Sequence, residues 1–429
     1  MDKFEATRGM RDFLPEEMEK RRYVIDIIRT TFKTYGFGEI WTPALESLGL
    51  LSAKSGGGDE IAKTIFTLKD QGGRMLGLKF DQTVPTSRVI ANNPQLTKPF
   101  KRFIISPVWR YERPQAGRYR EFWQADVDIF GSKNPEADVE TVACTAAVLT
   151  ALEFEEYEII INNRKLLKGL AMQFGFKENQ VVDLQRCIDK LDKNSEGEVV
   201  REAAEKGLDE DLVRDFIATI SMEGKPEDVL KKIKPSLKDT LALEGLGELE
   251  EFISLSKPYG IYEKLKLNLS MVRGLDYYTG TIFEFKATDA KIGSFMGGGR
   301  FDKLVSAAGG EAIAATGLSI GVDRLVEILR TKEKLKASGG CRVLVGYFPN
   351  CREKAIEIAQ GLRKAGVETD FDTKRRSVSK VLDYANAKKI PYVVLVGEKE
   401  LKENKVALKN METGEQKLVK ESELLKSLK

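Results

Sequence analysis

The stretch WRYERPQAGRYREFWQADVD, residues 109–128, decides how the rest of the chain is interpreted. It combines arginines, carboxylates and large aromatic rings around one proline and one glycine. A solvated charged surface does not need the aromatic rings, and a buried strand does not tolerate so many unpaired charges. The composition therefore predicts that a ligand or another part of the protein pairs with these side chains.

Alternation along residues 120–129 predicts a strand with two different faces. The polar face carries Arg120, Phe122, Gln124, Asp126 and Asp128. The other face, from Glu121 to Ile129, is mostly apolar and suits a core. An antiparallel partner at residues 103–112, joined through the turn RPQAG, would add Arg110 and Glu112 to the polar face. This surface suits a ligand with a flat base and several negative charges.

The alternative for the same hairpin is a solvated pair of strands held by cross-strand ion pairs. The crowding of aromatic side chains weakens that alternative without excluding it.

Composition restricts the class of protein. A chain of 429 residues predicts roughly two to four domains. A net charge of +3 does not by itself indicate nucleic-acid binding. The sequence has no apolar stretch of membrane-spanning length, and the charged segment MDKFEATRGMRDFLPEEMEKRR lacks the apolar region of a secretory signal, so we expect a soluble, cytoplasmic protein. Its four cysteines form no C-x-x-C pair and predict reduced thiols.

The sequence contains no histidine. This excludes an imidazole base, a Ser-His or Cys-His nucleophile and a histidine-ligated metal. An enzyme of this composition would work by placing charges, and Mg²⁺ bound through oxygen ligands is the metal that suits it.

Periodicity predicts the following elements in the first half of the chain. They are a helix over Glu16–Tyr35 between Pro15 and Gly36, a strand in FGEIWTP that stops at Pro43, a helix from near Pro85, two strands within 101–131 and a helix over Ala137–Leu152. Lys, Glu, Asp and Leu at helical spacing then predict an inserted helical domain over about 164–255. After the linker TKEKLKASGG, strands and helices alternate from Cys341 to Val396, which predicts a small α/β domain with a mostly parallel sheet.

Three segments resemble, in order, the three motifs of the class II aminoacyl-tRNA synthetases. GFGEIWTPALES is similar to the first motif, residues 109–128 to the second and GLSIGVDRL to the third. Each segment is weak alone, but the three together at the family's spacing form a specific signal. The resemblance implies an α/β (α+β) fold with an antiparallel-sheet catalytic core, and a homodimer whose interface the first motif builds.

The second motif is an Arg-x-Glu strand, a loop and then Arg-x-x-x-Phe. The resemblance implies that Arg110 holds the α-phosphate of ATP and the substrate carboxylate. It also implies that Glu112 meets the adenine amino group, Phe122 stacks on adenine and Arg118 reaches toward the γ-phosphate. Arg324, in the third motif, would contact adenine and the γ-phosphate, although such an arginine taken alone is usually a surface residue.

Two further segments, VRGLDYYTGTIFEF and GGGRFDKL, look like the signature peptides of the histidyl enzymes in this class. The resemblance implies that Arg273 is an additional cation at the α-phosphate, so that Arg110 and Arg273 are the catalytic pair. Tyr277 and Tyr278 would line a histidine pocket. Without the resemblance, the tyrosines would indicate core packing and the glycines a tight turn, and both can hold together with the functional roles.

FDQTVP matches the family's Asp-Leu-Thr-Val-Pro type. The match implies that Asp81 and Thr83 hold the α-amino group of histidine, with Gln82 in the same pocket. Gln124 and Asp128 would contact the carboxylate side and the imidazole. A carboxylate that faces an imidazole N–H accepts its hydrogen bond and rejects side chains that would leave it buried and unpaired.

Two positions depart from the family pattern. Gln82 stands where the family usually has Leu, and strand alternation predicts that it points away from its neighbours. Phe301 stands where the second signature has Tyr, so one phenolic hydroxyl of the expected pocket is missing. The second departure bears on histidine affinity and not on the reaction class.

The resemblance covers nearly all of the chain and implies its organisation. We expect a catalytic domain at 1–163 and 256–330, a helical insertion at 164–255 that leans on the tRNA acceptor stem, and an anticodon-binding domain at 338–429 in which TKRRS contacts phosphate. The implied reaction is ATP-dependent formation of histidyl-adenylate from L-histidine, with Mg²⁺, followed by transfer to tRNA(His).

Two alternatives belong to other functional classes. A histidine-sensing, non-catalytic relative, such as the regulatory subunit of ATP phosphoribosyltransferase, would be expected to lose Arg273 and the C-terminal domain, and this sequence keeps both. A non-enzymatic tRNA-binding module would have no reason to keep the arginines that contact ATP.

Overall fold

The computed structural model describes residues 4–53, 63–113, 118–191, 194–272, 277–289, 293–335 and 340–428. The chain divides into two compact units. The first consists of Met1–Asp12 and Val24–Leu335, and the second of Phe13–Tyr23 and Lys336–Lys429. The polar hairpin belongs to the first unit.

The first helix forms where the helical spacing predicts it. α1 spans Pro15–Thr34, with glutamates in its first turn and a lysine in its last turn. Proline suits a helix start because the amide that it lacks would have no partner there. Gly36 follows the helix at a φ of 77°, a conformation that favours glycine.

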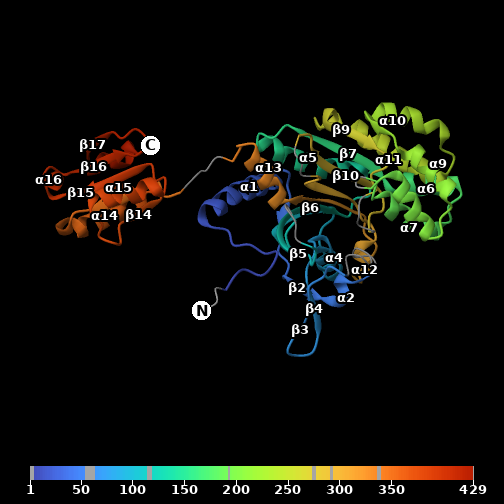
Figure 1. Cartoon of the computed structure of the whole chain (residues 1–429), viewed down its shortest axis with the longest axis horizontal. Helices are drawn as coiled ribbons and strands as arrows, with labels where there is room; N and C mark the ends of the chain where they lie inside the picture. Colours follow the sequence, from blue (N-terminus) through green and yellow to red (C-terminus); the bar gives the residue numbers. More distant parts are fainter. Residues whose placement is uncertain are drawn as a thin grey trace. The chain divides into compact units, whose positions relative to one another are not determined.

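A large, mostly antiparallel sheet is the framework of the first unit (Figure 1). Within the described residues its nine strands lie in the order β1-β5-β6-β12-β11-β10-β7-β9-β8. Their bounds are β1 Gly38–Glu39, β5 Phe100–Trp109, β6 Glu121–Phe130, β12 Ala315–Gly321, β11 Met296–Arg300, β10 Thr281–Ala287, β7 Tyr157–Asn163, β9 Leu265–Asn268 and β8 Glu223–Gly224. The β1–β5 and β7–β9 pairs are parallel, and the other pairs are antiparallel.

The hairpin predicted from residues 101–131 is confirmed as β5 and β6, which pair antiparallel along their whole lengths. Phe100 lies opposite Phe130 at one end and Trp109 opposite Glu121 at the other. The Arg110 N–H then donates to the Arg120 carbonyl at 2.9 Å. Residues 114–117 of the predicted turn lie outside the described residues.

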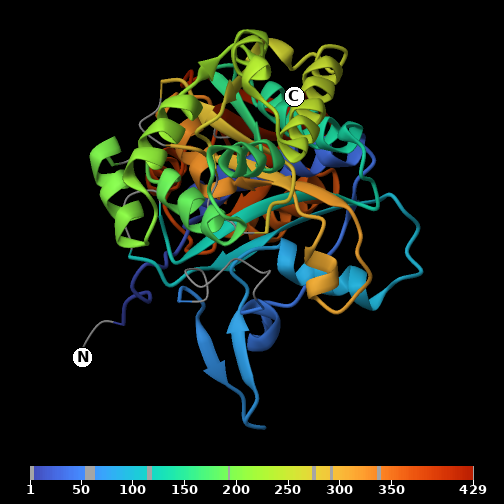
Figure 2. The same ribbon diagram turned by 90° about the vertical axis from the view of Figure 1, so that its right-hand side faces the viewer.

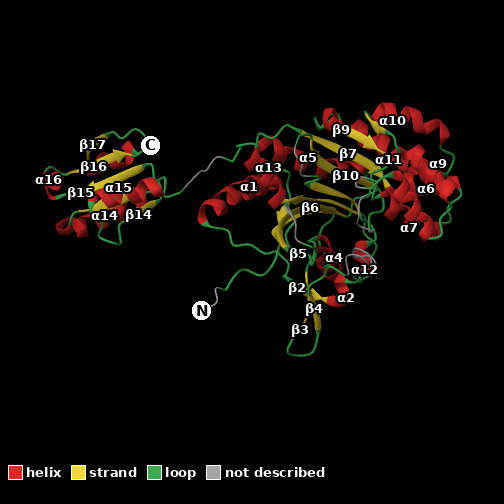
Figure 3. Cartoon of the chain, viewed as in Figure 1, coloured by secondary structure: helices red, strands yellow, loops and turns green. Residues whose placement is uncertain are grey.

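Helices cover one face of the large sheet and extend beyond its β7–β9 end. α5 (Pro135–Ala151) packs on β6 and β12, and α11 (Thr240–Ser256) packs on α5, β7 and β10 (Figure 3). The helical segment after β7 contains α6 Arg164–Phe174, α7 Glu178–Ile188, α8 Glu196–Glu205, α9 Glu210–Ile220, α10 Pro226–Ile233 and α11. Because this segment belongs to the same compact unit as the sheet, the domain boundaries expected near 164 and 255 stay predictions.

A small sheet projects from the large one (Figure 2). It contains β2 Leu45–Ser47, β4 Met75–Leu78 and β3 Thr67–Lys69, in the order β2-β4-β3. Among the described residues, the first unit also contains the helices α2 Leu48–Leu51, α4 Thr83–Asn92, α12 Leu304–Ala307 and α13 Val322–Thr331. α4 begins two residues before the proline that was expected to mark its start, and the side chain of Asp81 accepts from its Val84 N–H.

The second unit confirms the alternation of strands and helices. Its sheet has the order β14-β13-β15-β16-β17, parallel across β14, β13 and β15 and antiparallel beyond. Its elements are β13 Val343–Tyr347, α14 Arg352–Lys364, β14 Thr369–Phe371, α15 Val378–Ala387, β15 Tyr392–Val396, α16 Glu398–Lys402, β16 Lys405–Asn410, β17 Gln416–Lys420 and α17 Leu424–Ser427. In the part of the chain that the structure describes, none of the helices has the length and apolarity needed to cross a membrane.

Candidate active site

The polar face predicted for β6 continues across three strands of the large sheet. Residues directly opposite each other in antiparallel strands share a face. Gln124, Asp126 and Asp128 of β6 lie opposite Ser106, Ile104 and Arg102 of β5, and opposite Gly321, Ser319 and Gly317 of β12. We call this surface the polar face. The helix α5 packs on the other side of the sheet, where Arg300 of β11 pairs with Asp138 of α5 at 2.8 Å.

Glycines allow neighbouring side chains to pack directly against the sheet beyond β6. Gly299 of β11 lies opposite Gly317 of β12 and opposite Ile282 of β10. A Cβ on Gly317 would collide with Asp128 Oδ1, and a Cβ on Gly299 would lie 2.8 Å from Ile282 Cγ2 and 2.9 Å from Tyr278 Cδ1. The interpretation of the glycine run as a tight turn is therefore wrong, because the run forms the middle of a strand against which neighbouring residues pack closely.

Asp81 lies at the start of α4 and is 3% exposed. Its Oδ1 accepts from the Val84 N–H at 3.1 Å, whereas its Oδ2 is buried without a hydrogen-bond partner. Burial raises the pKa of Asp81 to about 7, and the charge of Asp126 adds to this, while the Val84 N–H and Arg110 oppose it. An ammonium group beside Oδ2 would complete the environment of this carboxylate.

Gln82 and Thr83 lie next to Asp81 but have different partners. The Gln82 amide is fully buried and donates to Ser106 Oγ at 2.8 Å and to the Ser106 carbonyl at 3.1 Å. Lys79 Nζ donates to the same Ser106 Oγ at 3.1 Å. Gln82 therefore connects α4 to β5, whereas the Thr83 side chain makes a hydrogen bond with Tyr277.

An arginine that sequence reasoning missed lies under this pocket. Arg102 has no exposed surface, and its Nη2 forms an ion pair with Asp128 directly across the sheet. Burial lowers the pKa of Arg102 to about 10, and the charges of Asp126 and Asp81 oppose this. The charge of Asp128, assigned from the sequence to substrate, is thus balanced within the protein. Alternation along β5 could have placed Arg102 on this face once the register was known.

Gln124 and Asp126 meet at Ser319. Gln124 Nε2 donates to Ser319 Oγ at 2.7 Å, and the Ser319 side chain hydrogen-bonds to Asp126. Gln124 Oε1 and Asp126 Oδ1 are buried and have no hydrogen-bond partner. Burial raises the pKa of Asp126 to about 6, against the opposing effects of Arg102 and Ser319. Together with Asp81 Oδ2, these atoms form a set of buried acceptors that lack donors.

Arg110 lies at the end of β5 that leads out of this pocket. Its Nε donates to the Phe80 carbonyl at 3.0 Å, and its guanidinium carbon lies 5.2 Å from the centre of the Phe122 ring. Glu112 and Arg118 are half exposed and form an ion pair at 3.5 Å. These four predicted ATP contacts therefore lie together at the open end of the hairpin.

Arg324 of the third motif lies in the first turn of α13, where Nη1 donates to the Ser294 carbonyl. Asp323, its neighbour, accepts from the Trp123 N–H at 2.7 Å and from Arg11 at 2.7 Å. α13 packs on β6, which places the third motif beside the second.

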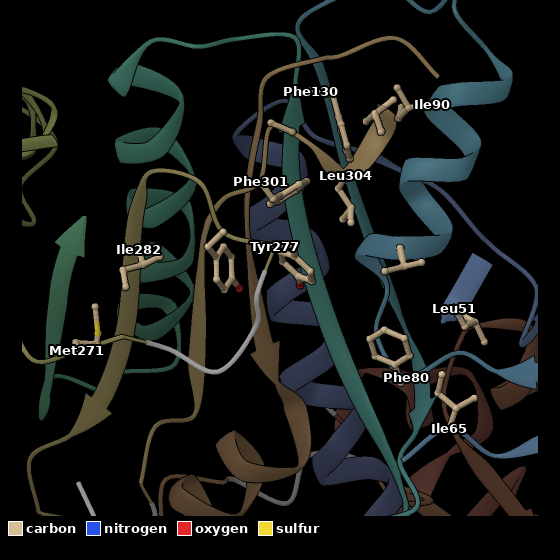
Figure 4. Close-up of a cluster of buried hydrophobic side chains, with 14 of the residues drawn as sticks. Leu51, Ile65, Phe80, Ile90, Phe130, Met271, Tyr277, Ile282, Phe301 and Leu304 are labelled. Atoms are coloured by element: carbon tan, nitrogen blue, oxygen red, sulfur yellow. The ribbon is translucent and has the colours of Figure 1, made fainter. Parts of the chain in front are cut away.

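The aromatic side chains of the pocket belong to a buried apolar cluster (Figure 4). The Tyr277 ring contacts Tyr278 at 4.9 Å and Phe301 at 6.0 Å between centroids, and Phe301 also contacts Phe130 at 5.8 Å. Phe301, which stands where the family has Tyr, thus packs beside Tyr277. Residues 273–276 lie outside the described residues, so the position predicted for Arg273 is not described.

Comparison with known families resolves which enzymes these motifs belong to. The family model described as histidyl-tRNA synthetase matches residues 9–325. The chain belongs to the histidyl-tRNA synthetase family. A second model, described as an anticodon binding domain, matches residues 342–429, within the range expected for that domain.

Relatives in this family match along their whole lengths. The histidine–tRNA ligase of Thermococcus kodakarensis is 38% identical over 100% of this chain and 99% of its own. That of Bacteroides fragilis is 38% identical, with 98% of each chain covered. The crystal structure of histidyl-tRNA synthetase from Nostoc has a TM-score of 0.86 and 30% identity, and covers 100% of this chain and 99% of its own. The expected fold, an antiparallel-rich core with a C-terminal α/β domain, is confirmed.

A further structural neighbour shows that this fold alone does not decide between a ligase and a regulatory subunit. A Bacillus halodurans protein, described as an ATP phosphoribosyltransferase regulatory subunit or histidyl-tRNA synthetase, has a TM-score of 0.77 at 24% identity and covers 92% of this chain and 98% of its own. This likeness is one of fold, so catalysis has to be argued from the side chains.

Proposed function

We propose that this chain activates L-histidine with ATP and attaches it to tRNA(His), as a member of the ligase family to which it belongs. The observation that supports this most directly is a set of buried acceptor atoms without donors: Gln124 Oε1 and Asp126 Oδ1 on the polar face, and Asp81 Oδ2 at the start of α4. A ligand for such a site has to bring N–H donors. Histidine brings an ammonium group and an imidazole N–H.

The first reaction is attack by the histidine carboxylate on the α-phosphate of ATP, with pyrophosphate leaving. The chain contributes positioning and charge rather than proton transfer, in keeping with its lack of histidine. In this proposal Arg110 holds the reacting carboxylate and the α-phosphate, while Phe122 carries adenine. Glu112 would accept the adenine amino group, and Arg118 would reach the γ-phosphate.

Recognition of histidine would use the deeper part of the same face. Asp81 and Thr83 would hold the α-ammonium group, and Gln124 would lie on the carboxylate side. Tyr277 and Tyr278 would enclose the imidazole. We keep Arg324 as the nucleotide contact of the third motif and Arg273 as the second cation at the α-phosphate.

The second reaction transfers the histidyl group. A ribose hydroxyl at the end of the tRNA attacks the carbonyl carbon of histidyl-adenylate, the bond to phosphate breaks and AMP leaves. The C-terminal domain would hold the anticodon, in line with the family model that matches residues 342–429.

Mg²⁺ would accompany ATP. Among the described residues no three His, Cys, Asp or Glu side chains lie together as in a protein metal site. Mg²⁺ in nucleotide sites takes most of its ligands from phosphates and water and needs only one or two carboxylates. Bound in this way, the ion would neutralise phosphate charge.

A homodimer and a cytoplasmic location belong to the same proposal. The first motif presents two large apolar side chains to solvent, Trp41 at 70% and Leu45 at 40% exposure. A second copy of the chain would cover them. Light scattering on the purified chain measures the oligomeric state, and a monomer at micromolar concentration would contradict the dimer.

The test of the activity is ATP–pyrophosphate exchange with each amino acid in turn. Exchange that depends on histidine alone, followed by charging of tRNA(His), is the expected result. A chain that binds histidine by calorimetry but gives no exchange would favour the histidine-sensing alternative. Exchange with a different amino acid would refute the assignment of the substrate.

A further inference from the structure

The amino-terminal segment lies against the open end of the polar hairpin. The Met10 N–H donates to the Thr7 carbonyl at 2.8 Å and closes a turn, whose third residue, Gly9, has a φ of 85° that favours glycine. The Gly9 carbonyl accepts from the Arg120 N–H at 2.8 Å, and the Arg8 carbonyl accepts from Arg120 Nη1 at 3.3 Å. The turn is therefore attached to the residue that precedes β6.

Arg11 follows this turn and makes two contacts at once. Its Nη2 donates to Asp323 Oδ1 at 2.7 Å, and its guanidinium carbon lies 3.3 Å from the centre of the Tyr119 ring. The side chain of Arg11 is 34% exposed, whereas that of Asp323 is 8% exposed. A guanidinium can stack through its plane while its N–H groups bind a carboxylate. Arg11 thus joins the residues before β6 to the start of α13.

Asp323 connects α13 to β6. An acidic residue in the first turn of a helix commonly interacts with the dipole of its own helix. Here Asp323 Oδ1 accepts from Arg11, and Oδ2 accepts from the Trp123 N–H at 2.7 Å. The paired part of β12 ends at Gly321, opposite Gln124, so Asp323 supplies an acceptor to the residue of β6 that lies just beyond the ladder.

The residues joined by these contacts are the sequence neighbours of proposed ATP contacts. Tyr119 follows Arg118, Trp123 follows Phe122 and Asp323 precedes Arg324. The residues proposed for the α-ammonium group of histidine belong instead to the start of α4. A displacement of the amino-terminal segment would therefore move the nucleotide contacts and leave those histidine contacts in place.

We propose that Arg11 is a positioning residue for ATP: it holds the start of α13 against the residues before β6, so that the contacts of the second and third motifs meet on one nucleotide. This inference rests on the proposed function and adds to the nucleotide site a residue outside the three motifs.

The charge of Arg11 contributes in the same direction. ATP is an anion, and Asp323 is a mostly buried carboxylate next to a residue assigned to its phosphates. Arg11 balances this carboxylate through a charge-assisted hydrogen bond. Without Arg11, the negative charge of Asp323 would oppose the binding of the nucleotide.

The test separates the two substrates. The full-length parent, Arg11→Met and Arg11→Lys are assayed by ATP–pyrophosphate exchange, with ATP and histidine varied in turn. We expect Arg11→Met to raise the KM for ATP about tenfold and to leave the KM for histidine within about twofold of the parental value. Arg11→Lys should recover part of the ATP affinity, because lysine keeps the charge but cannot present the planar stack. An unchanged KM for ATP, or an equal rise in both KM values, would overturn the inference.

Asp323→Asn tests whether Arg11 acts through Asp323. Asparagine keeps an oxygen for the Trp123 N–H but loses the charge that pairs with Arg11. Asp323→Asn should raise the KM for ATP, and the double variant Arg11→Met with Asp323→Asn should raise it no further than the larger single change. Effects that multiply in the double variant would give Arg11 a contact with ATP of its own and would refute the positioning role.

Arg330→Met is the matched control. Arg330 also binds a carboxylate on α13, with hydrogen bonds of 2.7 and 3.2 Å to Glu327, but both residues of that pair belong to the same helix and are exposed. The KM for ATP should stay at the parental value in this variant. A rise as large as that in Arg11→Met would reveal a general effect of surface charge and contradict the specific role of Arg11.

Calorimetry with ATP alone measures the loss of affinity without the reaction. Arg11→Met should bind ATP about tenfold more weakly than the parent, and equal affinity would overturn the inference. A parent that binds ATP but shows no histidine-dependent exchange would contradict the proposed function, and the comparison of ATP affinities would still decide the role of Arg11. A parent that binds no ATP would overturn both.

Discussion

Arg102→Met removes the charge that balances the carboxylates under the pocket while keeping a long side chain. In the parent, Arg102 has no exposed surface and is ion-paired with Asp128, which is 1% exposed. Removing one partner of a buried pair leaves the other charge uncompensated and typically costs about 3–5 kcal/mol. We therefore expect the free energy of unfolding to fall by about 3–5 kcal/mol at pH 8.

The loss should depend on pH. Without the opposing charge of Arg102, the pKa of Asp126 in the folded protein rises further above its value in the unfolded chain. Such a group contributes stability that is fully present below its unfolded pKa and is lost as pH rises through its folded pKa. Since burial already raises the pKa of Asp126 to about 6, the penalty should be smaller at pH 5 by at least about 1 kcal/mol.

Urea unfolding followed by tryptophan fluorescence measures this. The three tryptophans, Trp41, Trp109 and Trp123, all belong to the first unit, so the signal reports that unit alone. The double variant Arg102→Met with Asp128→Asn is the control, because removing both partners should recover most of the stability. A loss under about 1 kcal/mol, or one that is equal at pH 5 and pH 8, would refute the assignment of Arg102 as the balancing charge.

Three further predictions concern the substrate. Gln82→Leu loses two hydrogen bonds to Ser106 but also removes a buried unpaired oxygen, so the free energy of unfolding should change by no more than about 1 kcal/mol. The KM for histidine should stay unchanged, and a tenfold rise in that KM would place Gln82 in contact with the substrate. Because burial raises the pKa of Asp81 to about 7, histidine binding near pH 6.5 should release a proton from the Asp81 carboxyl group. Calorimetry in two buffers measures this release, which should be lost in Asp81→Asn. Equal proton release in that variant would assign the proton to another group. Arg273→Ala should slow histidyl-adenylate formation by about 10²-fold while histidine still binds, and Arg273→Lys should recover only part of that rate. Near-normal pre-steady-state rates in Arg273→Ala would remove Arg273 from the mechanism.

Local patterns in the sequence were sufficient to predict many of the helices and strands. The helix from Pro15, the two strands of the polar hairpin and the alternation of the C-terminal unit lie within a few residues of their predicted positions. Helix and strand periods depend on neighbours along the chain, so a short window contains the information. The motifs likewise identified the family, because most of the residues assigned to nucleotide contacts are adjacent in one hairpin.

The partners of the buried charges could not be predicted from local sequence patterns in the same way. Asp128 was assigned to substrate from its face on β6, but the opposite residue, Arg102, is known only from the register of β5 against β6. Ser319 lies 195 positions from Gln124 and reaches it only because β12 pairs with β6. Register depends on how the whole sheet packs and not on any local window.

The sequence by itself thus determined the elements, the family and the polar character of β6. Only the tertiary structure decided that one of its carboxylates, Asp128, is balanced within the protein by Arg102. The glycines illustrate the reason: GGG is equally compatible with a turn, and its role in close packing follows only from the neighbouring strands. Charge balance and close packing are properties of segments brought together by folding, and they have no signature in one segment alone.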